Sequence, residues 1–209
     1  MYSPCPKQSI CSSLGAQVEY LSQLECLRNN YRPSKVRVLF IAESPPRQRG
    51  NSITFFYSDK GSMLSKQLKE LLVIAGFRDF NVPSHKEFLK RFQDAGFYLI
   101  DAIRCPIIYR SRKRRFMRNC IYFLQEEIRR LDPEIIMVLG RTACEALKNI
   151  HLHNEGCKIT KIHGQAIKVT HKAKTLIVIF SLFPSVHNKG RTSDLAKPFR
   201  ILKNVIYSI

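Results

Sequence analysis

The sequence lacks any long apolar segment. No apolar run reaches the roughly 18 residues that a membrane-spanning helix needs, and the first ten residues lack the apolar core of a secretory signal. Internal repeats, low-complexity tracts and linkers rich in glycine, proline or serine are also missing. We therefore expect a soluble, intracellular protein, in the cytoplasm or nucleoid, or in the nucleus if the source is eukaryotic. With 209 residues, 44% of them hydrophobic, it should be a monomer with a single domain over residues 1–209, on which residues 1–30 pack as a helical segment.

Acidic residues are scarce. The chain has 16 aspartates and glutamates against 35 lysines and arginines, a formal net charge of +19. Such an excess favours a polyanionic partner, because each neutralised phosphate releases condensed counterions. A membrane-surface binder or a merely soluble basic protein would also fit this charge. The phosphate loops G-x-x-x-x-G-K-[ST] and G-x-G-x-x-G are both absent, which counts against a nucleotide-binding protein. We therefore expect DNA, double- or single-stranded, as the partner, and no membrane.

The sequence does contain short apolar runs that alternate with amphipathic stretches. The apolar runs predict strands at residues 36–42, 97–101, 134–140, 165–170 and 175–181. The amphipathic stretches predict helices at residues 15–28, 63–75, 85–94, 116–131, 142–148 and 194–207. Strands that alternate with helices predict an α/β fold, here a three-layer α/β/α sandwich with a mainly parallel central sheet.

Polar residues follow several of the predicted strands. Glu43 follows the first strand, Asp101 ends the second, and residues 183–188 follow the last. Charge at the mouth of an apolar sheet is costly unless it is used or paired. Because ligands bind beyond the carboxyl ends of the strands in such sheets, we expect a site at this edge.

Six sequence pieces resemble the motifs of the uracil-DNA glycosylase superfamily, and they occur in the family order. They are IAESPP at 41–46, FYSDKGSML at 56–64, LIDAIRCP at 99–106, DPEIIMVLGRTA at 132–143, HG at 163–164 and FPS at 183–185. The likeness is closest to the thermostable iron–sulfur branch and runs from about residue 36 to residue 191. It implies the uracil-DNA-glycosylase-like fold. It also implies a monofunctional DNA glycosylase that flips a damaged or deaminated base and hydrolyses its N-glycosidic bond in base-excision repair.

The resemblance assigns roles to three residues near the first two motifs. Glu43 is placed like the family's acidic residue, which orients a water or stabilises the oxocarbenium-like sugar. The alternative for Glu43 is a cap on the following loop. Phe56 resembles the aromatic residue that stacks on the flipped base, although a core phenylalanine is an alternative. Ser44 is expected to contact the base.

Two base-binding positions depart from the family pattern. Asp101 stands in the place of an asparagine, and Phe183 in the place of a histidine. An ionised aspartate only accepts hydrogen bonds, whereas a protonated one could match uracil or an amino-bearing base such as cytosine. Phe183 cannot donate the hydrogen bond that supports charge on O2 of the base. His187 is a candidate catalytic residue that could partly substitute. We therefore expect a preference shifted or broadened away from uracil, and the alternative is a catalytically weak or inactive DNA-binding protein of the same fold.

Basic and polar residues around these motifs are candidates for contacts with the DNA backbone. A charge run is often only a solvated face, and a nuclear-localisation signal fits part of the same set. The candidate DNA-binding residues are Arg110, Arg112, Lys113, Arg114, Arg115, Ser185, Asn188, Lys189 and Arg191.

The chain has seven cysteines, an odd number that cannot all pair, and we expect the protein to be intracellular. Free thiols or metal ligands are therefore favoured over disulfides. The separation of Cys105 and Cys120 is close to that of two cluster ligands in the iron–sulfur branch. A [4Fe-4S] cluster needs four thiolates, and the resemblance implies Cys5, Cys11, Cys105 and Cys120. The alternative is that Cys105 and Cys120 are small core residues. A zinc site built from His151, His153 and Cys157 is less favoured, because no spaced partner pair follows.

Overall fold

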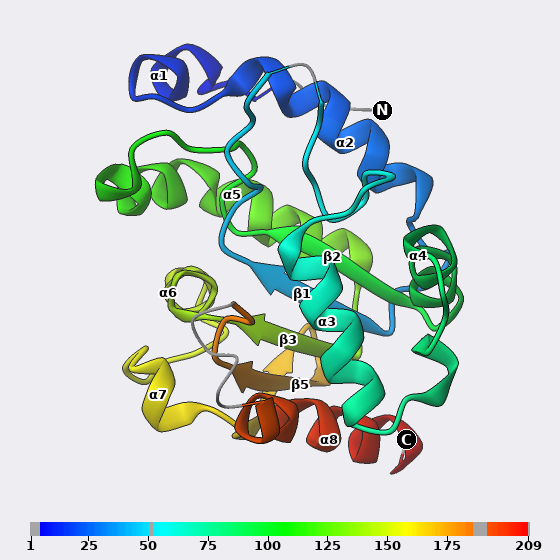
Figure 1. The fold of residues 1–209 in the computed structure, drawn as a ribbon. Helices are drawn as coiled ribbons and strands as arrows, with labels where there is room; N and C mark the ends of the chain where they lie inside the picture. The colour runs from blue at the N-terminus through cyan, green and yellow to red at the C-terminus, as the bar shows by residue number, and fades with distance from the viewer. Residues whose placement is uncertain (1–4, 51, 186–191, 209) are drawn as a thin grey trace.

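The computed structural model describes residues 5–50, 52–185 and 192–208. Its centre is a sheet of order β2-β1-β3-β5-β4 (Figure 1). The strands β2, β1, β3 and β5 run parallel, and β4 pairs antiparallel with β5 at one edge. The strands are β1 (Val38–Ala42), β2 (Phe97–Asp101), β3 (Ile135–Leu139), β4 (Ala166–His171) and β5 (Lys174–Ser181). The predicted α/β class and mainly parallel sheet are confirmed.

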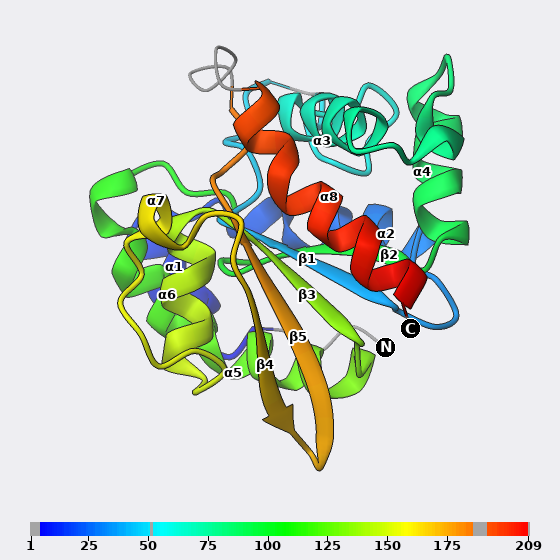
Figure 2. The same cartoon turned by 90° about the horizontal axis from the view of Figure 1, so that it is seen from below.

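Helices cover both faces of the sheet and complete the three layers (Figure 2). One face carries α3 (Met63–Ile74), α4 (His85–Asp94) and α8 (Thr192–Ser208), and the other carries α5 (Lys113–Leu131) and α6 (Arg141–Asn149). The short elements are α7 (Ile159–Ile162) and the 3₁₀ turns η1 (Val18–Tyr20), η2 (Arg78–Phe80) and η3 (Arg110–Arg112). Within the described ranges, no helix is both long and apolar enough to cross a membrane.

The burial of the strands follows from this covering. Every residue of β1, β2 and β3 is buried, which is why these strands consist of continuous apolar runs. The edge strand β4 instead alternates exposed and half-buried residues, as a strand with one solvated face should. The core therefore lies between the parallel strands and the two helical layers.

The predicted helix over residues 15–28 is wrong in its first part. The structure has α1 (Gln8–Ser13), then η1, and then α2 (Leu21–Asn30). Gly15 has φ +91°, a left-handed conformation that interrupts a helix, and the Tyr109 ring lies where a Cβ on Gly15 would be. The chain here is extended: Gln17 N–H donates to the Pro106 carbonyl and Ile108 N–H to the Gly15 carbonyl, both at 2.9 Å. The pairing attaches the N-terminal segment to the loop that follows β2.

Candidate functional site

A cavity of about 580 Å³ opens at the carboxyl ends of β1 and β2. The parallel register pairs Ala42 with Asp101, so Glu43, the next residue, lies beside the end of β2. Backbone hydrogen bonds from Ala102 to Ala42 and from Ile103 to Glu43, both 2.9 Å, continue this pairing past the strand ends. The residues predicted for the site that line the cavity are Glu43, Ser44, Phe56, Asp101, Arg110, Lys113, Phe183 and Ser185.

Glu43 is held by two hydrogen-bond donors from the helical layer that contains α5 and α6. Lys113 Nζ, at the start of α5, lies 2.8 Å from Glu43 Oε2, and the Thr142 hydroxyl of α6 donates to the same oxygen. Burial by itself raises the pKa of Glu43, but the hydrogen bonds from Lys113 and Thr142 and the charge of Arg110 outweigh it, so the pKa is lowered. Glu43 is therefore a fixed carboxylate at neutral pH. Among the described residues, no hydrogen bond from the loop after Glu43 to its side chain is found, so the structure gives no support to the alternative role as a loop cap.

Asp101 is buried and belongs to a charge network under the cavity. Arg28 of α2 donates through Nη2 to Asp101 Oδ2 at 3.0 Å and through Nη1 to Glu25 Oε1 at 2.7 Å. Burial raises the pKa of Asp101 to about 7; the Arg28 charge opposes the rise, and the Glu25 charge supports it. Because Arg28 is shared between two carboxylates, it only partly offsets the burial of Asp101. The carboxyl group is thus divided between its two protonation states near neutral pH.

Phe56 takes part in both of the environments that the sequence left open. It is 2% exposed and packs against Tyr57, Phe88 and Phe92, with ring centroids 4.9, 6.1 and 5.3 Å away. It also lines the cavity. Its backbone is held as well, because His85 Nε2 lies 3.0 Å from the Phe56 carbonyl oxygen. Phe56 is therefore a core residue that presents a rigid apolar wall to the cavity.

Phe183 closes the cavity from the loop after β5. Gly140, with φ +89°, permits its approach, because a Cβ on Gly140 would lie 2.9 Å from Phe183 Cβ. The loop is held by His163: Leu182 N–H donates to Nδ1 at 3.0 Å, and Nε2 lies 2.9 Å from the Asp194 carbonyl oxygen. Burial lowers the pKa of His163. A neutral ring that accepts at Nδ1 carries its proton at Nε2, so both contacts are hydrogen bonds.

The comparison with protein families agrees with this arrangement. The sequence model of the Uracil DNA glycosylase superfamily matches residues 29–203. The chain belongs to this superfamily. The match spans all five strands and every residue that lines the cavity. It is a match to the superfamily as a whole, so the iron–sulfur branch stays a prediction. A comparison with individual curated proteins finds no match.

In this uracil-DNA glycosylase superfamily member, the residues predicted to bind DNA fall into separate groups. Arg110 and Lys113 line the cavity, whereas Arg112 donates to the Leu14 carbonyl at 3.0 Å and lies over the Tyr109 ring. Arg114 and Arg115 are exposed. Four predicted site residues, His187, Asn188, Lys189 and Arg191, lie outside the described residues.

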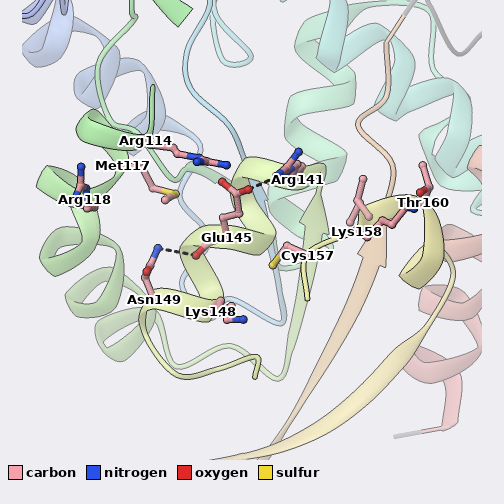
Figure 3. A pocket seen from close by; sticks show the side chains of 11 residues that line it. Arg114, Met117, Arg118, Arg141, Glu145, Lys148, Asn149, Cys157, Lys158 and Thr160 are labelled. Carbon is pink, nitrogen blue, oxygen red and sulfur yellow. Dashed lines mark hydrogen bonds and ion pairs between the residues drawn. The ribbon is translucent and has the colours of Figure 1, made fainter. Parts of the chain in front are cut away.

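A second cavity, of about 960 Å³, lies between α5, α6 and the segment before α7 (Figure 3). Its cationic side chains come from all three elements, and its one acidic side chain, Glu145, is paired with Arg141 at 2.8 Å. The cations are Arg114, Arg118, Arg141, Lys148 and Lys158. Arg114, predicted from the basic run, therefore faces this second cavity, next to the one at the strand ends.

Electrostatic effects link the four cysteines implied as cluster ligands, although among the described residues they are not a group placed to hold a metal ion. Burial raises the pKa of Cys105 to about 12, and the neighbouring thiols of Cys120, Cys5 and Cys11 add to the rise. Cys120 is affected by Cys11 and Cys5 in the same sense, and burial, the largest cause, brings its pKa to about 11. Cys11, Cys105 and Cys120 are buried, and Asn119 Nδ2 lies 3.6 Å from Cys11 Sγ. The pairing of the N-terminal segment with the loop after β2 is what brings Cys11 to Cys105.

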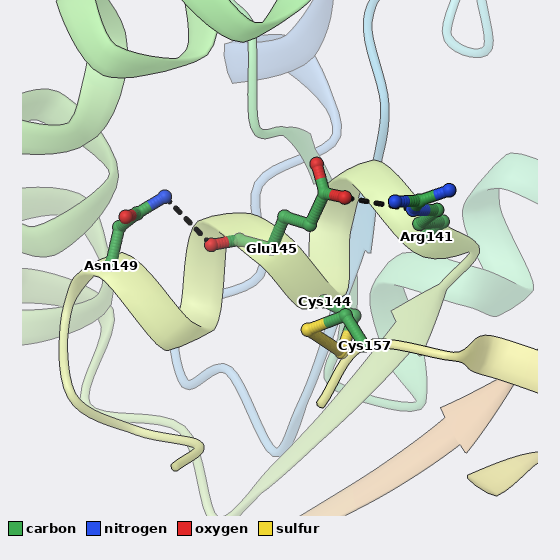
Figure 4. The surroundings of a disulfide bond; sticks show 5 residues. All are labelled: Arg141, Cys144, Glu145, Asn149 and Cys157. Carbon is green, nitrogen blue, oxygen red and sulfur yellow. Dashed lines mark hydrogen bonds and ion pairs between the residues drawn. A yellow bond between two sulfur atoms is a disulfide. The ribbon is translucent and has the colours of Figure 1, made fainter. Parts of the chain in front are cut away.

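The expectation of free thiols is wrong for one pair. Cys144 of α6 and Cys157 form a disulfide with a Cα–Cα distance of 5.7 Å (Figure 4), because the chain after α6 returns to the helix. The less favoured zinc set of His151, His153 and Cys157 is not the group that the structure brings together, and His151 is exposed. Cys144 takes its place: the ligand atoms of Cys144, His153 and Cys157 all lie within 4.8 Å of one another, close enough to hold a metal ion.

Sequence reasoning missed two partners of the site. Arg28 binds Asp101 across 73 positions, and Thr142 binds Glu43 across 99. Thr142 lies inside the motif at 132–143, just after the strand predicted at 134–140, and so close to the sheet edge where the site was expected. Arg28 had a local signal too, because it shares a helical face with Leu21 and Leu24, both of which are buried.

Proposed function

We propose that this protein is a monofunctional DNA glycosylase that binds an extruded base in the 580 Å³ cavity and hydrolyses its N-glycosidic bond. The observation that carries the proposal is the meeting of Glu43, Phe56 and Asp101 in one cavity at the ends of adjacent parallel strands. A carboxylate, a rigid aromatic wall and a polar group that can read a base edge are the parts that such a reaction needs.

Glu43 is proposed as the catalytic residue. Its lowered pKa keeps it ionised at neutral pH, so it can orient a water molecule and stabilise positive charge on the sugar as the base departs. Lys113 and Thr142 fix the carboxylate through Oε2. Because the Lys113 ammonium is paired with Glu43, we propose water as the nucleophile and not a lysine amine, which makes the enzyme monofunctional.

Asp101 is proposed to set the choice of base. The protonated carboxyl group offers one donor and one acceptor, which match uracil and also an amino-bearing base such as cytosine, whereas the ionised group offers only acceptors. With a pKa of about 7, both forms are available near neutral pH. We therefore propose a preference that is broader than uracil alone. Phe183 supplies no hydrogen bond to the departing base, so bases that leave easily should be favoured.

The test is an excision assay on labelled oligonucleotides that carry uracil, hypoxanthine, xanthine, a thymine mismatch or unmodified cytosine, each single- and double-stranded. We expect alkali-labile cleavage at one or more of these bases, and its loss in Glu43→Gln. The matched control is Glu70→Gln, an exposed glutamate of α3. A preference for uracil as strict as that of asparagine-bearing relatives would overturn the proposed role of Asp101.

The alternative is a DNA-binding protein of the same fold that has weak or no catalysis, and Phe183 is the observation that favours it. No cleavage of any substrate, together with tight binding that weakens steeply with salt, would support this alternative. The cations of the two cavities, with Arg115 beside them, form the surface that we propose for the phosphate backbone.

We further propose that Cys5, Cys11, Cys105 and Cys120 hold the [4Fe-4S] cluster that the resemblance implies. The donor chemistry fits, because these are four free cysteines, three of which raise the pKa of the fourth, Cys105, and an amide donor, Asn119, lies at Cys11 Sγ. Such a cluster would tie the N-terminal segment to the loop after β2 and to α5. The expected result is bound iron and acid-labile sulfide that are lost in Cys105→Ser and kept in Cys26→Ser, a change at an exposed thiol. Equal iron in both variants would contradict the proposal.

A further inference from the structure

A second group of possible metal ligands, Cys144, His153 and Cys157, includes neither the residues of the cavity at the strand ends nor the four cysteines discussed above. Cys144 is fully buried in α6, and Cys157 is half-buried where the chain returns to this helix (Figure 4). His153, in the loop between them, is 3% exposed. Their ligand atoms lie within 4.8 Å of one another. Three residues separate His153 from Cys157, a spacing common among zinc ligands.

His153 supplies an independent sign of a ligand. Both of its ring nitrogens are buried, and neither has a hydrogen-bond partner among the described residues. The ring packs on Phe180 with centroids 4.8 Å apart. An imidazole without a partner is unusual in a protein interior, since buried polar groups are nearly always satisfied. A metal ion is a partner that a ring nitrogen of histidine commonly takes.

We propose that Cys144, His153 and Cys157 bind a zinc ion when the Cys144–Cys157 disulfide is reduced. Two thiolate sulfurs and one imidazole nitrogen are a donor set that zinc accepts readily. Three protein ligands leave one tetrahedral position for a water molecule or an anion. Cys157 lines the 960 Å³ cavity, so solvent can reach the sulfur side of the site.

The chemistry of the two forms balances. A dithiol reductant transfers two electrons to the disulfide, and with two protons the S–S bond becomes two thiols. Zinc then displaces the two thiol protons to solvent, and the imidazole donates a lone pair without losing a proton. In the reverse direction, a disulfide oxidant takes two electrons from the sulfurs, the S–S bond forms again, and the zinc ion is released.

The charge of the surroundings is compatible with this site. Arg141, Lys148 and Lys158 line the adjacent cavity, so a further net positive charge would be costly. Two thiolates and one zinc ion sum to zero, and binding therefore adds no charge there. The site would hold the loop that carries His153 and Cys157 against α6, as the disulfide does in the oxidised form.

The test uses the full chain, reduced with a phosphine and titrated with zinc against a chromophoric chelator. The wild type should bind one more zinc ion than Cys157→Ser or His153→Ala, and oxidised glutathione should release that ion. Cys26→Ser is the matched control, and it should keep the zinc. Cys105→Ser should keep it too, because that thiol belongs to the other group of cysteines. Zinc that is lost with Cys105 and kept in Cys157→Ser would overturn the proposal.

A second measurement needs no variant, so a folding defect cannot obscure it. The reduced wild type is alkylated with and without zinc, and the modified cysteines are identified by peptide mass. Zinc should slow the alkylation of Cys144 and Cys157 at least tenfold and leave Cys26 unchanged. Equal alkylation rates at Cys144 and Cys157 in both samples would show a structural disulfide without a metal site, and would contradict the proposal.

Discussion

Glu43 and Asp101 line the same cavity from the ends of neighbouring strands. The surroundings of the two carboxyl groups, here called the Glu43 wall and the Asp101 wall, shift their pKa values in opposite directions. The Glu43 wall is half-buried and provides two donors of its own, so the pKa of Glu43 is lowered. The Asp101 wall is buried and shares Arg28 with Glu25, so the pKa of Asp101 is raised to about 7. At the Glu43 wall the hydrogen bonds and nearby charges together outweigh the effect of burial on the pKa, whereas at the Asp101 wall burial decides the direction of the shift. Two carboxyl groups whose pKa values differ in this way can take different roles, one as a fixed charge and one as a group that recognises the hydrogen-bond pattern of a base.

Removal of the Glu43 charge should have the largest effect. Glu43→Gln keeps the side-chain shape but loses the carboxylate that we propose to orient water and stabilise the sugar cation. We expect excision to slow by about 10²–10⁴-fold, with DNA affinity changed by less than about threefold. Single-turnover excision and fluorescence anisotropy with the same oligonucleotide measure the two quantities, with Glu70→Gln as the control. Equal activity in the two variants would exclude Glu43 from catalysis.

Removal of Arg28, the cation shared by Asp101 and Glu25, should destabilise the folded protein. Arg28→Met leaves Asp101 and Glu25 buried without their common partner, which should lower the free energy of unfolding by about 3–5 kcal/mol. Denaturant unfolding measures the change. Arg129→Met, at an exposed arginine paired with Glu126, should leave the free energy of unfolding nearly unchanged. A small loss in Arg28→Met that matches this control would contradict the buried network.

The pH dependence should separate the two walls. Only the protonated form of Asp101 presents both a donor and an acceptor, and this form is populated below its pKa of about 7. Excision of uracil should therefore be high below pH 7 and should fall by up to about tenfold per unit above it. Asp101→Asn does not titrate and should remove this step. Rates measured from pH 5.5 to 8.5 test it, and a step of equal size in Asp101→Asn would assign it elsewhere.

The same shift predicts the sign of a stability change. The pKa of Asp101 is raised in the folded protein, so the folded state holds the proton more tightly than the unfolded state. This contribution to stability is complete below the ordinary pKa of 3.8 and is lost as the pH rises through about 7. The difference in unfolding free energy between wild type and Asp101→Asn should therefore change in favour of the variant from pH 4.5 to 8. A difference that stays constant over this range would refute the raised pKa.

A smaller effect should follow at the Glu43 wall. Lys113→Gln removes the ammonium group that donates to Glu43, and its charge, so the pKa of Glu43 should rise and the acid limb of the rate profile should move to higher pH. At neutral pH the loss should be about fivefold or less, because Lys113 is partly exposed. Lys148→Gln, which lowers the net charge equally but at the second cavity, should leave the acid limb in place. An identical shift in both variants would point to general electrostatics and not to the ion pair.

Much of the fold could be predicted from local patterns. The strand at 97–101 and the helix at 85–94 have the predicted bounds, because the buried strand is an apolar run that ends in Asp101 and the helix has a serine cap and a clear amphipathic face. The helix predicted at 15–28 failed at Gly15, where pairing with residues 106–108 overrides the local preference. The part of the site at the strand ends was predictable as well, since a parallel sheet brings the residues after its strands to one edge.

The sequence alone determined the alternation of strands and helices, the order of the superfamily motifs and the excess of positive charge, because each of these is a local or additive property of the chain. Only the tertiary structure decided which polar groups interact: Arg28 with Asp101, Thr142 with Glu43, and, through an electrostatic effect, Cys11 with Cys105. The pKa of a carboxyl group depends on its solvent exposure and on charges within a few ångströms. Those neighbours come from segments up to 99 positions away, and no local pattern records them.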